Sequence, residues 1–173
     1  MSETVHDLLS RDHVRLDGLL EAALRPDGGI DAQAYAAFRS GLLRHIGIEE
    51  RVLFAELRRQ SEFSDLERQL HRDHAAMAAL LALAPAKREI ELIRQILSDH
   101  NPLEEEAEGL YYRVVNLPES NASRLIERIR EFPQVPVAPY SDSPALRRSI
   151  DQLVQLAAEG RKRLGGMPGS GVR

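Results

Sequence analysis

Cysteine and tryptophan are absent from the 173-residue chain, and aromatic residues make up only 5% of it. Without cysteine there is no disulfide, no zinc site built on thiolates and no thiol nucleophile. The scarcity of aromatic side chains argues against a stacking platform for nucleic acid. An excess of basic charge is also lacking, because the formal net charge is −4. We therefore expect neither a nucleic acid nor an anionic membrane surface as the main partner.

Long apolar runs are lacking as well. No uncharged stretch approaches the roughly 18 residues that a membrane span needs, and Met1–Leu9 has no basic-then-apolar signal pattern. From these absences we expect a cytoplasmic protein without a membrane partner. Glycine and proline are clustered, and the segments between the clusters are rich in Leu, Ala, Glu, Arg and Gln, which favour helices. The sequence thus predicts an all-α fold.

Residues that favour turns and helix starts divide the first two thirds of the chain. Arg25–Gly29 reads as a loop, and Asp31 and Ser64 are plausible N-caps. The segments between these breaks carry apolar residues at alternating spacings of three and four, as amphipathic helices do. We predict helices over residues 3–24, 32–61, 64–84 and 87–116. Four long amphipathic helices with short connections predict an up-down-up-down four-helix bundle with additional C-terminal helices.

The sequence changes character after residue 117. It predicts a short helix, a proline-rich extended linker, an amphipathic helix and a disordered tail. With the preceding bundle, the predicted units are 1–117, 118–143 for the short helix and linker, 144–164 for the C-terminal helix, and 165–173 for the tail. The C-terminal helix would pack on the bundle or on a second chain, which makes a homodimer one candidate assembly. We expect the basic cluster Arg161–Arg163 to be a solvated helix end.

Two short patterns occur twice in the sequence. Arg11–His13 recurs as Arg72–His74, and His45–Glu50 recurs as His100–Glu105. The predicted bundle therefore resembles one helix pair copied once. Each copy contributes an isolated histidine, followed on the next helix by a histidine with a glutamate four residues later.

These histidines and glutamates interrupt otherwise apolar helix faces near the middle of each predicted helix. Residues at i and i+4 share one face of a helix, so each His–Glu pair points to a common position. An unpaired polar group in an apolar core costs about 1–3 kcal/mol, and an ionised carboxylate costs more. Metal cations would satisfy the whole set, and imidazole with carboxylate suits iron better than magnesium or calcium. The predicted metal ligands are His13, His45, Glu49, His74, His100 and Glu104.

Two iron ions would fit this set of ligands. Four histidines provide two nitrogens per metal, and two bridging glutamates add two oxygens to each. A bridging oxide or hydroxide supplies a fifth ligand, so an octahedral iron keeps one open position. Such a position on a redox metal in a dry core is what the binding of O2, NO or peroxide requires.

Residues 5–115 resemble the hemerythrin-like (HHE cation-binding) family. The resemblance rests on two His-His-Glu half-motifs, the first with His13, His45 and Glu49 and the second with His74, His100 and Glu104. Glu49-Glu50 followed by Val52–Phe54 also resembles the first motif of the family. The resemblance implies a non-haem di-iron centre on a four-helix bundle, with bridging glutamates and terminal histidines.

Some residues near the second half-motif leave alternatives open. Pro102 lies between His100 and Glu104 and should kink or locally widen the helix. A bulge there would leave Glu105 as a rival to Glu104. His71 is either a fifth histidine ligand, which would favour simple O2 carriage, or a residue at the edge of the apolar face. We expect Tyr111 to serve in core packing, with a contact to bound oxygen species as the alternative.

Three functions are consistent with these residues. The first is a di-iron module that binds or senses O2 or NO, or stores iron. The second is a redox enzyme acting on peroxide or NO at the same centre, so the sequence leaves open whether the protein is an enzyme. The third is a helical interaction protein with an empty site.

Overall fold

The computed structural model describes residues 3–60, 64–117 and 121–165. The described chain is helical, with 76% helix and no strands, which confirms the predicted all-α class. The helices are α1 Val5–Ala23, α2 Ala32–Ile48, α3 Phe54–Gln60, α4 Asp65–Leu80, α5 Lys87–Glu105, α6 Leu110–Val115, α7 Ala122–Arg130 and α8 Pro144–Gly165. A π-helical segment, Glu49–Leu53, joins α2 to α3 without a break.

Polar caps fix where the helices begin. The Asp31 carboxylate accepts from the backbone N–H of Gln33 and of Ala34, at 3.1 and 2.9 Å. The Ser64 side chain caps α4 in a reciprocal capping box with Glu67. Both caps that the sequence predicts are therefore present.

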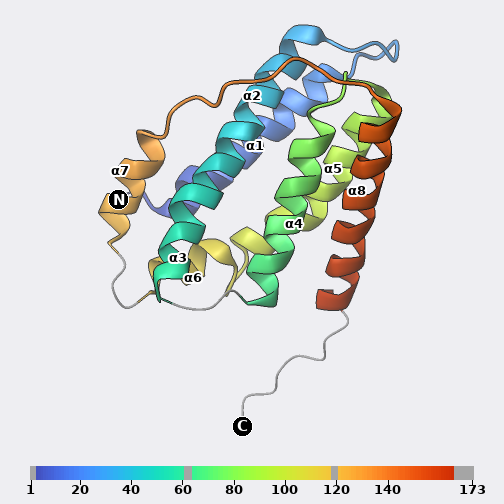
Figure 1. Cartoon of the computed structure of the whole chain (residues 1–173). Helices are drawn as coiled ribbons and strands as arrows, with labels where there is room; N and C mark the ends of the chain where they lie inside the picture. Colours follow the sequence, from blue (N-terminus) through green and yellow to red (C-terminus); the bar gives the residue numbers. More distant parts are fainter. Residues whose placement is uncertain (1–2, 61–63, 118–120, 166–173) are drawn as a thin grey trace.

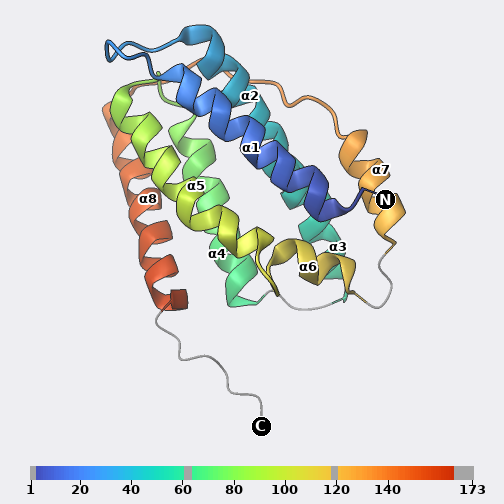
Figure 2. The same ribbon diagram turned by 180° about the vertical axis from the view of Figure 1, so that it is seen from behind.

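The long helices lie side by side (Figures 1 and 2). In both views α1 runs along α2, α4 runs along α5, and α8 lies outside α4. The up-down-up-down bundle remains the arrangement we propose for α1, α2, α4 and α5. Figure 1 also shows the connection from α7 to α8 crossing over the ends of these helices. Arg39 holds this connection, because its guanidinium donates to the Ala138 carbonyl at 2.8 Å and lies 4.2 Å from the Tyr140 ring centre.

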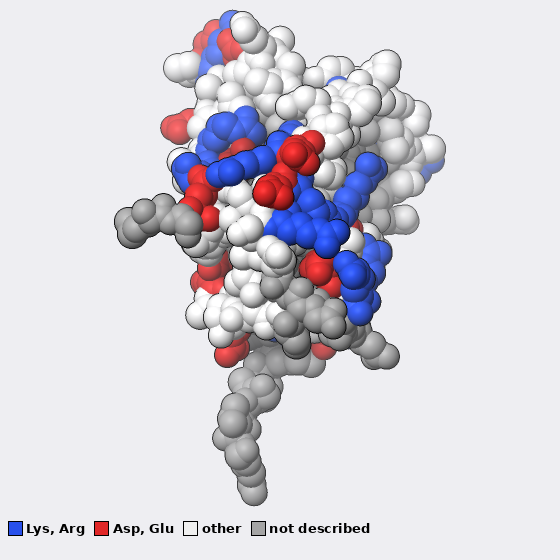
Figure 3. Space-filling model, turned by 90° about the vertical axis from the view of Figure 1, so that its left-hand side faces the viewer, with Lys and Arg blue, Asp and Glu red and all other residues white. Residues whose placement is uncertain are grey.

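The short helix α7 is held against the outside of the molecule by both apolar and charged contacts. Leu125 and Ile129 are buried in the apolar core. On the face that carries α7, basic side chains gather with acidic ones among them (Figure 3). Arg128 lies 3.5 Å from Glu56, and Arg130 pairs with Glu3. Surface ion pairs contribute only about 0–1 kcal/mol each, and the arginines of these two pairs are 36% and 58% exposed. We therefore attribute most of the docking to the apolar contacts.

The buried apolar side chains form two clusters. In α1, Leu9 belongs to one cluster and Leu16 to the other. In α4, Leu70 and Met77 are divided in the same way. On both helices a histidine lies between these two residues, His13 on α1 and His74 on α4. On α2, His45 likewise lies between Leu42 of one cluster and Ile48 of the other. The polar centre is consequently enclosed by apolar side chains above and below.

Two of the predicted long helices are interrupted. The helix predicted over 32–61 changes to a π-helical segment in which the Phe54 N–H donates to the Glu49 carbonyl. Such a turn accommodates one extra residue and is frequent at functional sites. The widening predicted near Pro102 is absent, because α5 continues as an α-helix through Pro102 to Glu105. The π-helical segment in the other copy of the repeat was not predicted from the sequence.

The helix predicted over 87–116 ends at Glu105, and a turn separates it from α6. In this turn Glu108 has a φ of 70°. A Cβ added at Gly109 would lie 2.7 Å from the Glu104 carbonyl oxygen, so the chain passes closer than a side chain permits. The turn is thus a tight reversal that brings α6 back toward the end of α5.

The segments after residue 117 agree with the predicted elements where the structure describes them. The short helix is α7, residues 131–143 contain no helix, and the C-terminal helix is α8. The predicted start of the short helix at Ser120 and residues 166–173 of the predicted tail lie outside the described residues, while Gly165, the predicted first residue of the tail, ends α8. The domain boundaries stay predictions. Among the described residues, no helix combines the length and the apolar character needed to cross a membrane.

Candidate metal centre

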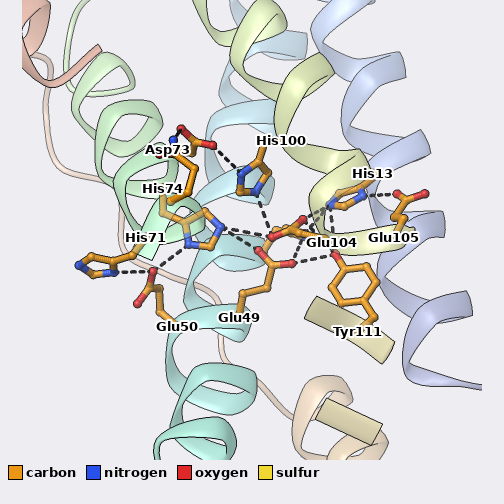
Figure 4. Close-up of polar contacts among 12 residues, drawn as sticks. His13, Glu49, Glu50, His71, Asp73, His74, His100, Glu104, Glu105 and Tyr111 are labelled. Carbon is orange, nitrogen blue, oxygen red and sulfur yellow. Dashed lines mark hydrogen bonds and ion pairs between the residues drawn. The ribbon is translucent and has the colours of Figure 1, made fainter. Parts of the chain in front are cut away.

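The six predicted ligand residues come together: Figure 4 shows five of them, and His45 lies beside His13, with their Nε2 atoms 2.8 Å apart. They project from α1, α2, the π-helical segment, α4 and α5. All are buried, with relative exposures between 0% for the two glutamates and 6% for His13. The residues are His13, His45, Glu49, His74, His100 and Glu104.

The Glu49 carboxylate lies between histidines of the two half-motifs. Its Oε1 atom is 3.2 Å from His45 Nε2, and its Oε2 atom is 3.2 Å from His74 Nε2. Each oxygen thus faces a different half-motif, as a bridging carboxylate would.

Glu104 occupies the equivalent position on the opposite side. Its Oε2 atom is 3.4 Å from His13 Nε2, and its Oε1 atom is 3.0 Å from His100 Nε2. The same Oε1 atom is 3.5 Å from His74 Nε2. Both carboxylates therefore belong to two groups of potential metal ligands, His13–His45–Glu49–Glu104 and Glu49–His74–His100–Glu104.

The spacing of these atoms fits metal coordination. Two ligands at right angles, with bonds of about 2.1 Å, stand about 3.0 Å apart. The distances above are 3.0–3.5 Å, close to this value, and the two ring nitrogens His13 Nε2 and His45 Nε2 are 2.8 Å apart. Within each four-residue group the candidate ligand atoms all lie within 4.8 Å of one another.

Three buried atoms at this centre have no hydrogen-bond partner among the described residues. They are Glu49 Oε2, His74 Nε2 and Glu104 Oε1. Although they approach one another to 3.2 and 3.5 Å, their orientations do not make hydrogen bonds. Leaving a buried polar atom unsatisfied costs about 1–3 kcal/mol. A cation between these atoms would remove that cost, so the residues present fit a metal.

A carboxylate orients each of the four histidines from the side away from the centre. His45 Nδ1 donates to Asp12 at 2.9 Å, and His100 Nδ1 donates to Asp73 at 3.3 Å. The sequence predicts Asp12 or Asp73, or backbone carbonyls, as such partners, but it does not predict those of the other two rings. His13 Nδ1 contacts Glu105 at 2.5 Å, and His74 Nδ1 contacts Glu50 at 2.8 Å. Such partners fix the ring orientation and leave each Nε2 atom directed at the metal position.

These contacts distinguish Glu104 from its neighbour. Glu104 is fully buried at the centre, whereas Glu105 is 32% exposed and its carboxylate contacts the outer nitrogen of His13. Glu105 is therefore placed as an orienting residue, and its neighbour has the position of a ligand. The adjacent pair Glu49 and Glu50 divides in the same way.

His71 and His6 lie away from the centre. The His71 side chain is 62% exposed, and its Nδ1 atom contacts Glu50 at 2.9 Å (Figure 4). His6 contacts the backbone carbonyl of Glu105 at 3.1 Å. Neither ring is directed at the candidate metal position, so the interpretation of His71 as an edge residue agrees with its placement.

Tyr111 reaches the centre from α6. Its hydroxyl donates to Glu49 Oε1 at 2.8 Å and lies 3.3 Å from both Glu104 Oε2 and His13 Nε2. The ring also belongs to the second apolar cluster. Burial, together with the two glutamate carboxylates, raises the pKa of Tyr111 well above its usual value, so the hydroxyl keeps its proton. The packing role predicted for Tyr111 is thus joined by a hydrogen-bonding role.

The histidines and carboxylates at the centre stabilise each other's charged forms. Burial disfavours the charged form of His45, but the carboxylates of Glu49 and Asp12 overcome it and raise the pKa of His45 to about 10. Burial and the nearby Glu104 carboxylate raise the pKa of Glu49, yet the histidines outweigh them and lower it to about 2.

The second half-motif shows the same pattern. Against the effect of burial, neighbouring carboxylates raise the pKa values of His74 and His100. Against burial again, histidines, with His100 first, lower the pKa of Glu104 well below its ordinary value. Protons on the imidazoles therefore supply the positive charge that the carboxylates require. A metal ion binds to a deprotonated Nε2 atom, so metal and protons would compete at this centre.

A surface cleft between α1 and α5 borders the centre at His13. Its volume is about 750 Å³, and its walls include His13, Glu105, Asn101 and Pro102. His13 is the most exposed of the six clustered residues. A small molecule would thus approach the centre from this side.

The fold and the buried cluster place the protein in a class, the helical proteins with a candidate metal site of histidines and glutamates in the core. The model of the hemerythrin HHE cation binding domain matches residues 4–108. The chain belongs to this family, and its His/Glu cluster indicates metal binding. No curated protein and no solved structure matches the chain. The matched region ends before α6, so α6, α7 and α8 lie outside it.

Proposed function

We propose that the protein binds two non-haem iron ions and uses them to bind or sense O2 or NO. Glu49 and Glu104 would bridge the two ions together with an oxide or hydroxide. His13 and His45 would hold one ion, and His74 and His100 the other. We assign these residues to an up-down-up-down four-helix bundle formed by α1, α2, α4 and α5.

The observation that carries the proposal is that two groups of candidate ligands share Glu49 and Glu104, beside buried atoms that lack hydrogen bonds. Glu49 Oε2, His74 Nε2 and Glu104 Oε1 are buried and lack hydrogen bonds among the described residues. Both glutamates belong to both groups of candidate ligands. A single ion would leave one group without its metal, whereas two ions satisfy both. Imidazole with carboxylate suits iron, and the family is one of cation-binding domains.

The protein groups around the centre support the binding of a small ligand. When bound, the two iron ions supply an open coordination position and exchangeable electrons. Tyr111 directs a protonated hydroxyl into the centre, where it donates a hydrogen bond to Glu49. The apolar clusters on either side limit access by water. The cleft beside His13 brings the surface close to the centre.

Metal content measured on the purified protein tests the proposal. We expect about two irons per chain after expression with iron, or after anaerobic addition of Fe²⁺ to the metal-free protein. Glu49→Gln should retain at most one. The matched control is Glu89→Gln. Glu89 is also buried, but it lies away from the centre and pairs with Arg147 at a distance of 3.2 Å. A wild-type chain that takes up no iron under either condition would contradict the proposal and favour a helical interaction protein.

Optical spectra separate binding from turnover. Binding of O2 or NO predicts a spectral change that reverses when the gas is removed. Repeated consumption of peroxide or NO by the iron-loaded protein would instead assign an oxidoreductase activity to the same centre. Storage of iron would appear as uptake well beyond two ions per chain. A cytoplasmic location stays a prediction. A homodimer through α8 also stays a prediction; on this helix Leu153 is 37% and Leu156 is 52% exposed.

A further inference from the structure

Helix α8 lies outside the family match at residues 4–108 but packs closely along α4. Ile150 and Ala157 of α8 are buried in the first apolar cluster. The Gln69 side-chain amide of α4 donates to the Ala157 carbonyl at 2.9 Å. A Cβ added at Gly160 would overlap the Gln69 side chain, so the two helices approach closely at this level. The approach places the next residue, Arg161, beside the metal centre.

Arg161 pairs with the carboxylate that orients His100. Its Nη1 atom contacts Asp73 Oδ1, and its Nε atom lies 3.4 Å from Asp99 Oδ2. The other oxygen of Asp73 accepts from His100 Nδ1 at 3.3 Å. The Arg161 side chain is only 13% exposed, and Asp73 is fully buried. The sequence prediction of a solvated helix end is therefore wrong for Arg161, because α8 turns this side chain inward against α4.

A buried carboxylate needs compensating partners. Removing the cation from a buried ion pair is strongly destabilising, because the remaining charge is left without compensation. Two neutral or titratable groups donate to Asp73, the Gln69 amide at 2.8 Å and the His100 ring at 3.3 Å. Among the described residues, only Arg161 brings a permanent positive charge to this carboxylate. Arg161 thus compensates the charge of the carboxylate that accepts a hydrogen bond from His100 Nδ1.

The other half-motif carries a similar but weaker arrangement. Arg15 Nε contacts Asp12 at 2.7 Å, and Asp12 accepts from His45. The Arg15 side chain is 50% exposed and Asp12 is 20% exposed, so water screens this pair. The repeat supplies both aspartates, whereas α8 supplies a buried arginine to only one.

We propose that Arg161 is a positioning residue that acts through Asp73 on His100, and that α8 thereby secures the metal held by His74 and His100. The inference rests on the proposed metal centre. Loss of a partner of a metal-bound histidine lowers metal affinity about 10–100-fold. Because Arg161 stands one residue further from the metal, its loss should weaken one of the two sites about tenfold and leave the other unchanged.

Anaerobic titration of the full-length, metal-free chain with Fe²⁺ against a competing chelator tests this inference. Wild-type protein should bind two equivalents, and Arg161→Gln should bind one of them about tenfold more weakly. Arg161→Lys, which keeps the charge, should recover part of the loss. Asp99→Asn removes the second contact of Arg161 and should bind iron as the wild type does. Arg15→Gln, the matched substitution at the exposed pair, should change affinity less than twofold.

A double substitution separates the proposed role from general support of the fold by α8. In an Asp73→Asn background, Arg161→Gln should produce no further loss of affinity, because Arg161 acts through that carboxylate. Far-ultraviolet circular dichroism checks that each variant retains its helices. An unchanged Arg161→Gln titration beside a wild type that binds two equivalents would overturn this inference alone. A further loss of Fe²⁺ affinity when Arg161→Gln is added to Asp73→Asn would also overturn it. A wild type that binds no Fe²⁺ would overturn the proposed function and this inference together.

Discussion

Substituting the two adjacent glutamates at the end of α5 one at a time gives the sharpest test of the centre. The Glu104 carboxylate is fully buried and lies 3.0–3.5 Å from the inner nitrogens of His13, His74 and His100. Both groups of candidate ligands include it. Glu104→Gln should therefore impair both metals, because it removes one negative charge that two cations share. We expect fewer than one iron per chain.

Glu105→Gln is the matched substitution. Glu105 touches the outer nitrogen of His13 at 2.5 Å and is 32% exposed. Its replacement should leave two metals at saturating Fe²⁺ but weaken one of them about 10–100-fold, as loss of an orienting partner does. Mass spectrometric metal analysis after passage over a chelating resin measures the retained iron, and competition with a chelator measures the affinity. If Glu105→Gln loses both metals while Glu104→Gln keeps two, the geometric assignment of the carboxylates is wrong.

Three further predictions concern the same centre. Tyr111→Phe removes the hydrogen bond to Glu49 and should lower the free energy of unfolding of the metal-free protein by about 1.5–3 kcal/mol in urea titrations; Tyr112→Phe, at a side chain that is 53% exposed, should have no effect. The pKa of His45, about 10 in the folded chain, lies above its ordinary value near 6.5. The stability that it contributes is fully present below about pH 6.5 and is lost as pH rises through 10, so urea stability of the metal-free protein should fall over that range. With iron bound, deprotonation favours the metal, so the gap in thermal midpoint between loaded and metal-free protein should widen with pH; a constant gap would argue against metal binding at His45. Gly109→Ala places a Cβ 2.7 Å from a backbone oxygen of α5 and should lower both the thermal midpoint and the iron content; an unchanged midpoint would show that the turn adapts.

The sequence predicted the meeting point of the helices because the periodicity of the apolar residues determines which faces are buried. Asp31 and Ser64 are recognisable from the sequence as caps, and both initiate helices. The six clustered residues could be found because they interrupt apolar faces at matching positions of a repeat. Those signals are local, and they carry over to the structure directly.

The departures arise where tertiary contacts decide the outcome. The π-helical turn at Glu49–Leu53 differs from an α-helix by one residue in its hydrogen-bond pattern, which periodicity over a short segment does not resolve. The orienting roles of Glu50 and Glu105 depend on this turn and on the end of α5. A signal for them was present, since the Glu-Glu pair occurs in both copies of the repeat. Arg161 carries no such signal, because its partner Asp73 is distant in sequence and α8 is not part of the repeat.

The orienting contacts follow the repeat, since those of the aspartates stay within one copy and those of the second glutamates cross between the copies. In each copy the Asp-His pair sends its histidine to the centre, while its aspartate accepts from a histidine on the next helix. In each Glu-Glu pair the first glutamate faces the centre, and the second orients a histidine of the other copy. Neither copy can therefore complete its own set of oriented ligands without the other. A helix pair of this kind would need a second copy before it could hold metal.

The surroundings of the two halves break this symmetry. The half with His13 borders the cleft between α1 and α5, and its Asp12–Arg15 pair is exposed to water. The half with His100 is covered by α8, which contributes the buried Arg161 to Asp73. Two metals bound in equivalent ligand sets would consequently differ in exchange, because one side is open to small molecules and the other is closed by an element outside the repeat. Stepwise removal of iron by a chelator should follow two rates in the wild type, and Arg161→Gln should bring the slower rate closer to the faster one.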